Sequence, residues 1–430
     1  MKSYMYESKV LFGSIFKWIF YSTITGIIVG SSTTFFLKVL DFSVEKAQNL
    51  PFKFFLLLPL AFIISVFLVR TFAKDAEGHG TEKIIEAIHK KDGNMNIFVV
   101  PIKLLATIVT IAFGGSAGKE GPSAQIGATI MSFISQKANL TKEEKKKLII
   151  CGISAGFGAV FGTPIAGAIF AIEVLFIGTI LYDVLLPSFI SAIVALEVAK
   201  HFGIPHHDFH MTISQGGNYL LYVQTIIAGL IFALIGFLFI QLLNKLEKIS
   251  HNHKDKPYKK ALIAGFILMF VGFFISEKSL GLSTNVMYSV LEGEKTTWYM
   301  PIAKIFNTAM TLSFGGSGGI LTPIFVIGAS SGSLLGQIFQ GNTAFFAGLG
   351  LVGLLAGTTN TPLAAIIMSI ELFGTQVTPF ASIASIISFI LIGHRSVYPT
   401  QILAIKKSAS LDMELGDEVK NTKIKKSSRR

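Results

Sequence analysis

The sequence predicts an all-α protein that crosses the membrane many times and consists of two repeated halves, each containing a broken helix. The first observation is composition: 51% of the 430 residues are hydrophobic, 14% are charged, and the mean hydropathy is +0.62. The second is that apolar stretches recur from residue 11 to 403 with only short polar gaps. A spanning helix needs roughly 20 apolar residues, so no large soluble domain fits between them. The third is a glycine-rich segment that occurs twice.

The first apolar stretch predicts a retained membrane helix. Lys17 interrupts the apolar run, and no small-x-small cleavage site follows, so a signal peptide is not indicated. The single cysteine, Cys151, lies in the apolar context LIICGIS. One cysteine excludes an intramolecular disulfide and a cysteine-based metal site, and we expect it to serve packing.

The excess of positive charge lies in connections. The net charge of +12 comes from 37 basic and 25 acidic residues, and the lysine-rich stretches are residues 70–91, 137–147, 245–260 and 406–430. By the positive-inside rule these stretches and both termini face the cytoplasm of a cell-membrane protein. Residues 201–244 contain no Lys or Arg, so their polar start is placed outside. Acidic residues interrupt the tail and aromatics are not interleaved, which favours a solvated tail at the lipid surface over nucleic-acid binding.

An internal repeat defines the domain organisation. Residues 114–127 (GGSAGKEGPSAQIG) align without gaps on residues 315–328 (GGSGGILTPIFVIG), at an offset of 201 positions. A second pair, TPIAGAIFAIE and TPLAAIIMSIE, matches residues 163–173 to 361–371 at an offset of 198. Two anchors in the same order indicate homologous halves. We predict a first repeat over 1–205, a second over 206–403, and a basic cytoplasmic tail over 404–430.

The glycine-rich segments are predicted to break their helices inside the membrane. The basic stretches that end at Lys91 and begin at Lys137 both face the cytoplasm, so the chain between them enters and returns. After Pro122 only about 14 residues remain, or roughly 21 Å of helix, against a hydrocarbon core about 30 Å thick. Paired breaks at matching places in two halves are typical of a transporter's binding site. The helix that follows each break presents its positive end, which favours anions.

Glu120 is the strongest candidate for function. It lies at a helix N-terminus within the break, where its carboxylate is able to occupy the anion site itself and leave when protonated or displaced. The alternative is a simple capping carboxylate. Lys119 either adds positive potential to the anion site or is merely solvated at the opening of the break. Glu173 and Glu371 are equivalent in the repeat, so we expect them to hold backbone or loop donors.

The histidines give a weaker signal. Four histidines lie close together in the sequence and are of a residue type that binds metals: His201, His206, His207 and His210. Nothing in the sequence brings their side chains together, so we expect a polar outer loop. Weak metal binding or pH sensing is the alternative. His79 lies between glycines just before a predicted helix. GKEG is not a phosphate loop, no nucleophile elbow of the GxSxG type is indicated, and the HExxH motif is absent from the sequence. We therefore predict that the protein is not an enzyme, with neither a cofactor nor a metal.

The chain resembles the CLC family of chloride channels and chloride/proton exchangers. GKEGP at 118–122 is similar to the family's GREGP or GKEGP motif, and GGILTP at 318–323 to its GxFxP segment. GHG at 78–80 resembles the start of its GSGIP motif, and RSVY at 395–398 stands where the family has its chloride-binding tyrosine. The resemblance implies two inverted halves with re-entrant helices, one ion pathway per subunit and a homodimer. Only 32 residues follow Tyr398, which implies the prokaryotic type without nucleotide-binding CBS domains.

The resemblance also implies residue roles. Glu120 matches the gating glutamate. Tyr398 matches the tyrosine that holds the central chloride, and Ile320 and Leu321 match the backbone donors of that site. Residues 119–121, with Lys119 and Gly121, would lend donors to the outer position.

Several residues depart from the family pattern. His79 occupies the place of the central chloride-binding serine, and Thr81 and Glu82 replace an aliphatic residue and proline. Leu321 replaces the usual phenylalanine, a modest change because the backbone is the ligand. Val174 stands where proton-coupled exchangers commonly carry a second glutamate.

Valine does not relay protons, so the first hypothesis is channel-like or uncoupled chloride conduction gated by Glu120. A chloride/proton antiporter with a different proton route is the alternative. An anion-binding membrane enzyme or receptor is the third. The fluoride-exporting branch ranks lower, because it typically loses the proline that is Pro122 here and has methionine where His79 stands.

Overall fold

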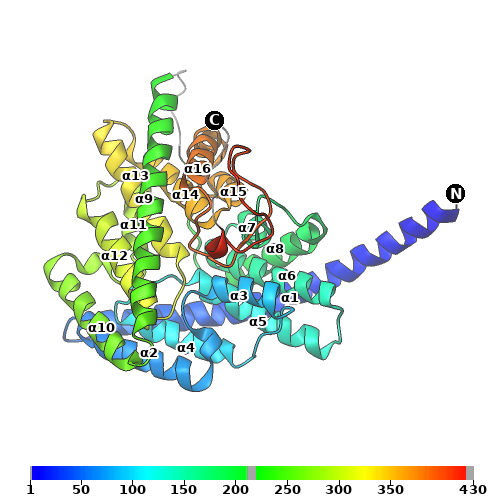
Figure 1. The fold of residues 1–430 in the computed structure, drawn as a ribbon, viewed down its shortest axis with the longest axis horizontal. Helices are drawn as coiled ribbons and strands as arrows, with labels where there is room; N and C mark the ends of the chain where they lie inside the picture. Colours follow the sequence, from blue (N-terminus) through cyan, green and yellow to red (C-terminus); the bar gives the residue numbers. More distant parts are fainter. Residues whose placement is uncertain (1, 210, 212–218, 423–430) are drawn as a thin grey trace.

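A computed structural model describes residues 2–209, 211 and 219–422, and these are almost entirely helical (Figure 1). The first half contains α1 (Lys2–Gln48), α2 (Leu58–Phe72), α3 (Gly80–Lys90), α4 (Val99–Ala112), α5 (Glu120–Lys137), α6 (Lys142–Phe161), α7 (Pro164–Glu173) and α8 (Leu185–His201). The second half contains α9 (Tyr219–Asn252), α10 (Pro257–Phe274), α11 (Thr284–Leu291), α12 (Tyr299–Ser313), α13 (Leu321–Ile338), α14 (Thr343–Thr359), α15 (Pro362–Phe373) and α16 (Thr378–Ile392). Two short strands are β1 (Phe176–Ile177) and β2 (Ile402–Leu403).

The element order confirms the all-α, multi-pass prediction. Within the described residues, seven helices are long and apolar enough to cross a membrane. Each half also has a shorter apolar helix that begins at a proline, α7 in the first half and α15 in the second. The helices that begin at the glycine-rich breaks are α5 and α13, with 18 residues each. The predicted boundary at 205/206 adjoins residues 210 and 212–218, which lie outside the described part of the chain.

The two halves are joined by reciprocal hydrogen bonds. The Gly118 N–H donates to the Gly319 carbonyl at 2.7 Å, and the Gly319 N–H donates back at 2.6 Å. The Ser116 N–H donates to Thr311 Oγ1 and the Ser317 N–H donates to Thr110 Oγ1, both at 3.0 Å. Because each bond has a counterpart with its partners exchanged, a local two-fold axis relates the halves at the breaks.

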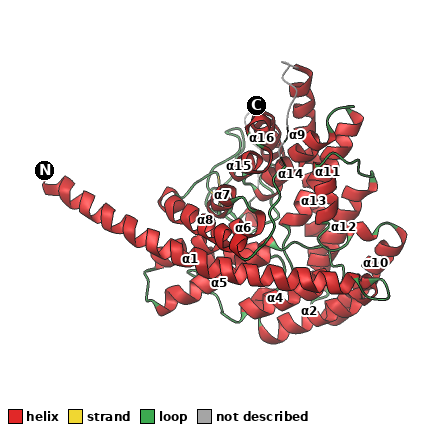
Figure 2. Ribbon diagram, turned by 180° about the vertical axis from the view of Figure 1, so that it is seen from behind, coloured by secondary structure: helices red, strands yellow, loops and turns green. Residues whose placement is uncertain are grey.

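The centre of the molecule is packed through small residues. A β-carbon on Gly127 would lie 2.4 Å from the Gly152 carbonyl oxygen, and one on Gly328 would lie 2.2 Å from the Gly350 carbonyl oxygen. Glycine at these positions lets α5 approach α6, and α13 approach α14, at backbone distance. The close packing fixes the N-termini of α5 and α13. In contrast, the N-terminal end of α1 projects away from the rest of the molecule (Figures 1 and 2).

The basic stretches meet on one face. The Arg70 guanidinium donates to the Lys254 carbonyl at 3.2 Å, which joins the first stretch to the third. Lys142 pairs with Asp92 at 2.7 Å, and Lys90 pairs with Glu418 at 2.8 Å. All four stretches therefore share one side of the molecule, as the positive-inside argument requires.

The C-terminal segment corrects one expectation. Residues 404–422 do not form a solvated tail but fold back onto β2, which pairs in parallel with β1. The Leu403 N–H donates to the Asp417 carbonyl at 2.9 Å, and Met413 and Val419 are buried. The charged composition hid these widely spaced apolar side chains. Residues 423–430 lie outside the described chain.

Glu418 is expected to hold this segment in place in a pH-dependent way. Burial acts to raise its pKa, but the ion pairs with Lys90 and Lys420 outweigh burial and hold the pKa below its usual value. A depressed pKa means that the stabilisation is present above the unfolded pKa of about 4.3 and is lost as pH falls through the folded value. At pH 7 we expect Glu418→Gln to speed hydrogen exchange over residues 411–422. Asp412→Asn, at an exposed position, is the control. Equal exchange in the two variants would contradict the prediction.

Candidate functional site

Three helix N-termini meet at the centre of the molecule. These are the ends of α3, α5 and α13, and glycines let them approach one another. A β-carbon on Gly80 would lie 2.5 Å from the Gly121 carbonyl oxygen, and one on Gly319 would lie 2.8 Å from the Gly121 nitrogen. His79 pairs with Gly318 in a bridge of the parallel type. Because free N–H groups and positive dipole ends converge, the arrangement favours an anion.

The Glu120 carboxylate occupies one of these N-termini. Its side chain is 1% exposed and accepts a hydrogen bond from the Thr322 N–H at 3.1 Å and another from the Thr322 hydroxyl. Thr322 belongs to α13, so the carboxylate lies at the start of a helix of the other half. Glu120 is therefore a capping carboxylate, as the alternative interpretation expected, but the helix that it caps is α13 of the other half. Sequence reasoning missed Thr322, although it lies in the GGILTP segment.

The other predicted site residues surround Glu120. Ile320 is the N-cap residue of α13 and Leu321 its first residue, and both are buried. Tyr398 is fully buried, and its ring centroid lies 5.6 Å from that of His79. Thr81 lies beside the Tyr398 hydroxyl. That hydroxyl nevertheless forms no well-aligned hydrogen bond with any described residue. A buried hydroxyl without a partner suits an anion ligand.

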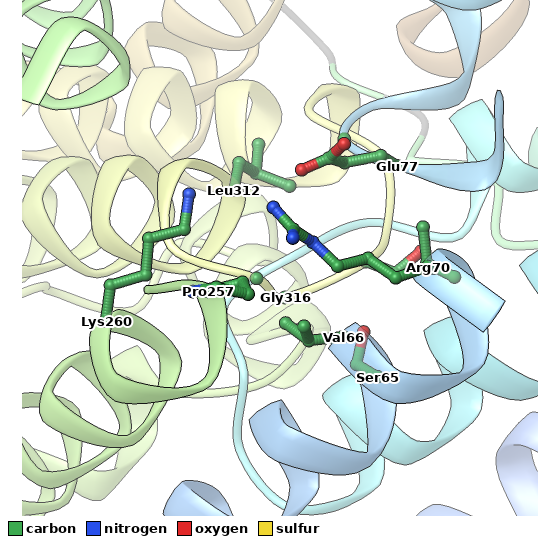
Figure 3. Close-up of a pocket in the computed structure, with 12 residues that line it drawn as sticks. Ser65, Val66, Arg70, Glu77, Pro257, Lys260, Leu312 and Gly316 are labelled. Atoms are coloured by element: carbon green, nitrogen blue, oxygen red, sulfur yellow. The ribbon is translucent and has the colours of Figure 1, made fainter. Parts of the chain in front are cut away.

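Cavities reach this cluster from two sides. The outer cavity has a volume of about 50 Å³, and its wall includes Lys119, Glu120, His206, His207 and Thr322. The inner cavity has a volume of about 380 Å³ and is lined by His79 together with residues of the basic stretches. A smaller cavity of about 20 Å³ shares Arg70, Glu77 and Lys260 with the inner one, and Figure 3 shows the Arg70 guanidinium pointing toward the Glu77 carboxylate.

Comparison with known proteins decides the family. The family described as "Voltage gated chloride channel" matches residues 60–393, more than half of the chain. The chain belongs to this CLC family. A "Chloride/fluoride channel protein" of Pseudomonas syringae pv. tomato is 32% identical over 396 residues, which cover 90% of this chain and 86% of the relative.

Solved CLC structures share the fold. The crystal structure of a CLC-type fluoride/proton antiporter has a TM-score of 0.85 at 28% identity and covers 90% of this chain and 97% of the other. A slow cyanobacterial Cl−/H+ antiporter has a TM-score of 0.75 at 19% identity, covering 87% of this chain and 94% of the other, which shows the fold alone. The CLC chain is therefore a membrane transport protein and not an enzyme.

Glu173 and Glu371 have the structural role predicted for them. The two oxygens of Glu173 accept hydrogen bonds from the Leu363 and Ala364 N–H groups at 3.1 and 2.9 Å. Glu371 accepts from the Ile165 and Ala166 N–H groups at 3.0 and 2.8 Å. Each glutamate of the repeat thus caps the short proline-initiated helix of the opposite half of the CLC fold.

Two buried lysines were missed by sequence reasoning. Lys103 donates to the Ala76 carbonyl at 3.2 Å and to the Gly78 carbonyl, just before α3. Lys304 donates to the Gly281 carbonyl at 2.7 Å, just before α11. The two lysines hold equivalent turns. Their offset of 201 positions, equal to that of the glycine-rich anchor, was the signal that could have found them.

Val174 does not join the site. It is fully buried at the C-terminus of α7, and its carbonyl accepts a hydrogen bond from the Gln401 side chain at 2.8 Å. It lines none of the three cavities described above.

The three outer histidines that the structure describes contact different parts of the protein. His206 bonds to the Ala159 carbonyl at 3.1 Å, and the His207 ring packs on that of Tyr288 at 4.4 Å. His201 is exposed, and His210 lies outside the described residues. No three His, Cys, Asp or Glu side chains are grouped to hold a metal within the part of the chain that the structure describes.

Proposed function

We propose that this CLC protein moves a small halide across the membrane, with Glu120 as the gate. The observation that carries the proposal is that the Glu120 carboxylate occupies the N-terminus of α13 at the wall of the outer cavity. An anion that takes this position must displace the carboxylate. Tyr398, His79 and the first-turn N–H groups of Ile320 and Leu321 would then surround the halide on its inner side, with Lys119 and Gly121 on its outer side.

Fluoride and chloride are both candidate anions, and fluoride is the first to test. The sequence ranked the fluoride branch low because of Pro122 and His79. Against that ranking, a relative that covers 90% of this chain has chloride and fluoride in its name, and a fluoride/proton antiporter matches with a TM-score of 0.85. Small, strongly hydrated fluoride suits a site with a hydroxyl and several N–H donors.

We propose that halide movement is coupled to protons in the opposite direction. The likeness to a CLC-type fluoride/proton antiporter at 28% identity supports coupling. The Glu120 carboxylate supports it as well, because it is able to carry a proton at the point where the anion passes. Uncoupled conduction is the second candidate, favoured by Val174, which is unable to relay a proton.

We further propose a homodimer in the cell membrane with both termini in the cytoplasm. The orientation rests on the shared basic face, which the positive-inside rule assigns to the cytoplasm. Cysteines introduced singly at Lys142, in a basic stretch, and at exposed His201, at the start of the segment placed outside, would report orientation through labelling of intact cells. Chemical cross-linking in liposomes would report the dimer.

Flux from liposomes tests the proposal. Purified protein is reconstituted with an outward fluoride or chloride gradient, and halide efflux and internal pH are recorded together. We expect halide efflux with stoichiometric proton uptake, and faster efflux of fluoride than of chloride. Halide efflux with no proton movement would replace exchange by uncoupled conduction. No halide efflux from folded protein would overturn the proposed function.

A further inference from the structure

The inner cavity contains carboxylates that the halide site does not use. Glu82, Glu77 and Glu247 line it, together with His79. Glu82 lies in the first turn of α3, and its N–H donates to the His79 carbonyl at 3.2 Å, so the two residues are held one turn apart. They stand where water in the cavity meets the central cluster.

Both side chains have buried polar atoms without a partner. His79 is 7% exposed, and its Nδ1 makes no hydrogen bond with any described residue. Glu82 Oε2 is likewise buried and unpartnered, and the Thr400 hydroxyl beside it does not reach hydrogen-bond geometry. Buried polar atoms are normally satisfied, so two such atoms at the end of a cavity indicate that a mobile species completes them.

His79 lies on the way from the cavity to Glu120. Its ring is 5.6 Å from that of Tyr398, between centroids. The His79 backbone pairs with Gly318, and the next residue, Gly319, bonds to Gly118, which lies beside the Glu120 carboxylate. Glu82, His79 and Glu120 therefore form a series of titratable groups from the inner cavity to the gate. The usual position for an inner proton-binding glutamate is Val174, which lines none of the three cavities.

We propose that Glu82 and His79 form the inner proton-binding pair through which protons pass between the inner cavity and Glu120. This inference rests on the proposed proton-coupled exchange. A proton from cavity water binds the Glu82 carboxylate. The acid gives that proton to neutral His79, which becomes imidazolium, and Glu82 is again a carboxylate. The imidazolium gives a proton to the Glu120 carboxylate when that side chain has turned toward Tyr398, and His79 returns to its neutral form.

The charges around the pair suit a transient carrier. Positive groups disfavour a lasting imidazolium, whereas the carboxylates favour its formation. The charged and titratable groups that face the pair from the surrounding elements are Arg70, Glu77, Lys83, Lys103, Glu247, His251, Lys254, Lys260 and Lys420. Burial and the neighbouring Lys83 and Lys103 act against the imidazolium, so His79 carries the proton only in passing.

Paired flux measurements on variants test the inference. In reconstituted full-length protein, Glu82→Gln and His79→Asn are each expected to lower the ratio of protons to halide by about 10-fold or more, with halide efflux retained. Glu82→Asp keeps a carboxylate and is expected to retain proton movement. Glu86→Gln is the matched control, since Glu86 lies one turn after Glu82 on α3 but lines none of the three cavities. It is expected to leave both fluxes unchanged.

The outcomes separate the pair from the proposed exchange. An unchanged proton-to-halide ratio in both Glu82→Gln and His79→Asn would overturn the pair alone. Loss of halide efflux together with proton movement, in variants that elute like the parent protein, would assign the residues to the anion path and also overturn the pair. Absence of proton movement in the parent protein would overturn the exchange and the pair together.

Discussion

Replacing Glu120 with alanine is expected to lower proton flux by about 100-fold or more while halide flux continues. The carboxylate lines the outer cavity and holds the N-terminus of α13. Alanine neither carries a proton nor competes with the halide for the N–H donors. The measurement is the ratio of proton uptake to halide efflux in liposomes with a halide gradient. Proton movement at the parental ratio in Glu120→Ala would exclude this residue as the gate.

Thr322→Val tests the hydrogen bond to Glu120 separately from the carboxylate itself. It removes the hydroxyl that bonds to Glu120 but preserves shape and keeps the carboxylate. A carboxylate held by fewer donors leaves more readily, so halide efflux at pH 7 is expected to rise several-fold, with proton coupling retained. Loss of proton coupling in Thr322→Val would indicate that the hydroxyl itself takes part in proton transfer.

Replacing Glu173 with alanine is expected to destabilise the fold by about 3 kcal/mol or more. Its buried carboxylate holds the Leu363 and Ala364 N–H groups at the start of α15, and a hydrogen bond to a charged group contributes about 1.5–3 kcal/mol. Without it, both donors are left without an acceptor in a buried environment. We expect the midpoint of thermal unfolding in detergent to fall by several degrees.

The repeat supplies the control for this prediction. Glu371 makes the equivalent pair of bonds to α7, but its carboxylate is more exposed, so water is able to replace it. Glu371→Ala is therefore expected to lower the midpoint less than Glu173→Ala. Equal midpoints for the parent protein and Glu173→Ala would show that the reciprocal caps do not stabilise the fold.

The sequence by itself determined the class of protein and its repeated design. Composition and the length of the apolar stretches require membrane helices, because only such helices satisfy the backbone in lipid. The offset of 201 positions between the two glycine-rich segments identified the breaks. Glu120 was recognisable because an ionisable residue within a membrane break is costly and needs a reason.

Tertiary structure decided which groups meet across the halves. Glu120 bonds to Thr322, which is 202 positions away, and Glu173 bonds to a helix that begins 189 positions later. The number of residues between two positions does not give their distance across a two-fold axis, so neither partner could be predicted from the sequence. The buried apolar side chains of the C-terminal segment and the complete burial of Val174 were hidden for the same reason. Burial depends on which distant elements pack against a residue, and local sequence patterns do not record that.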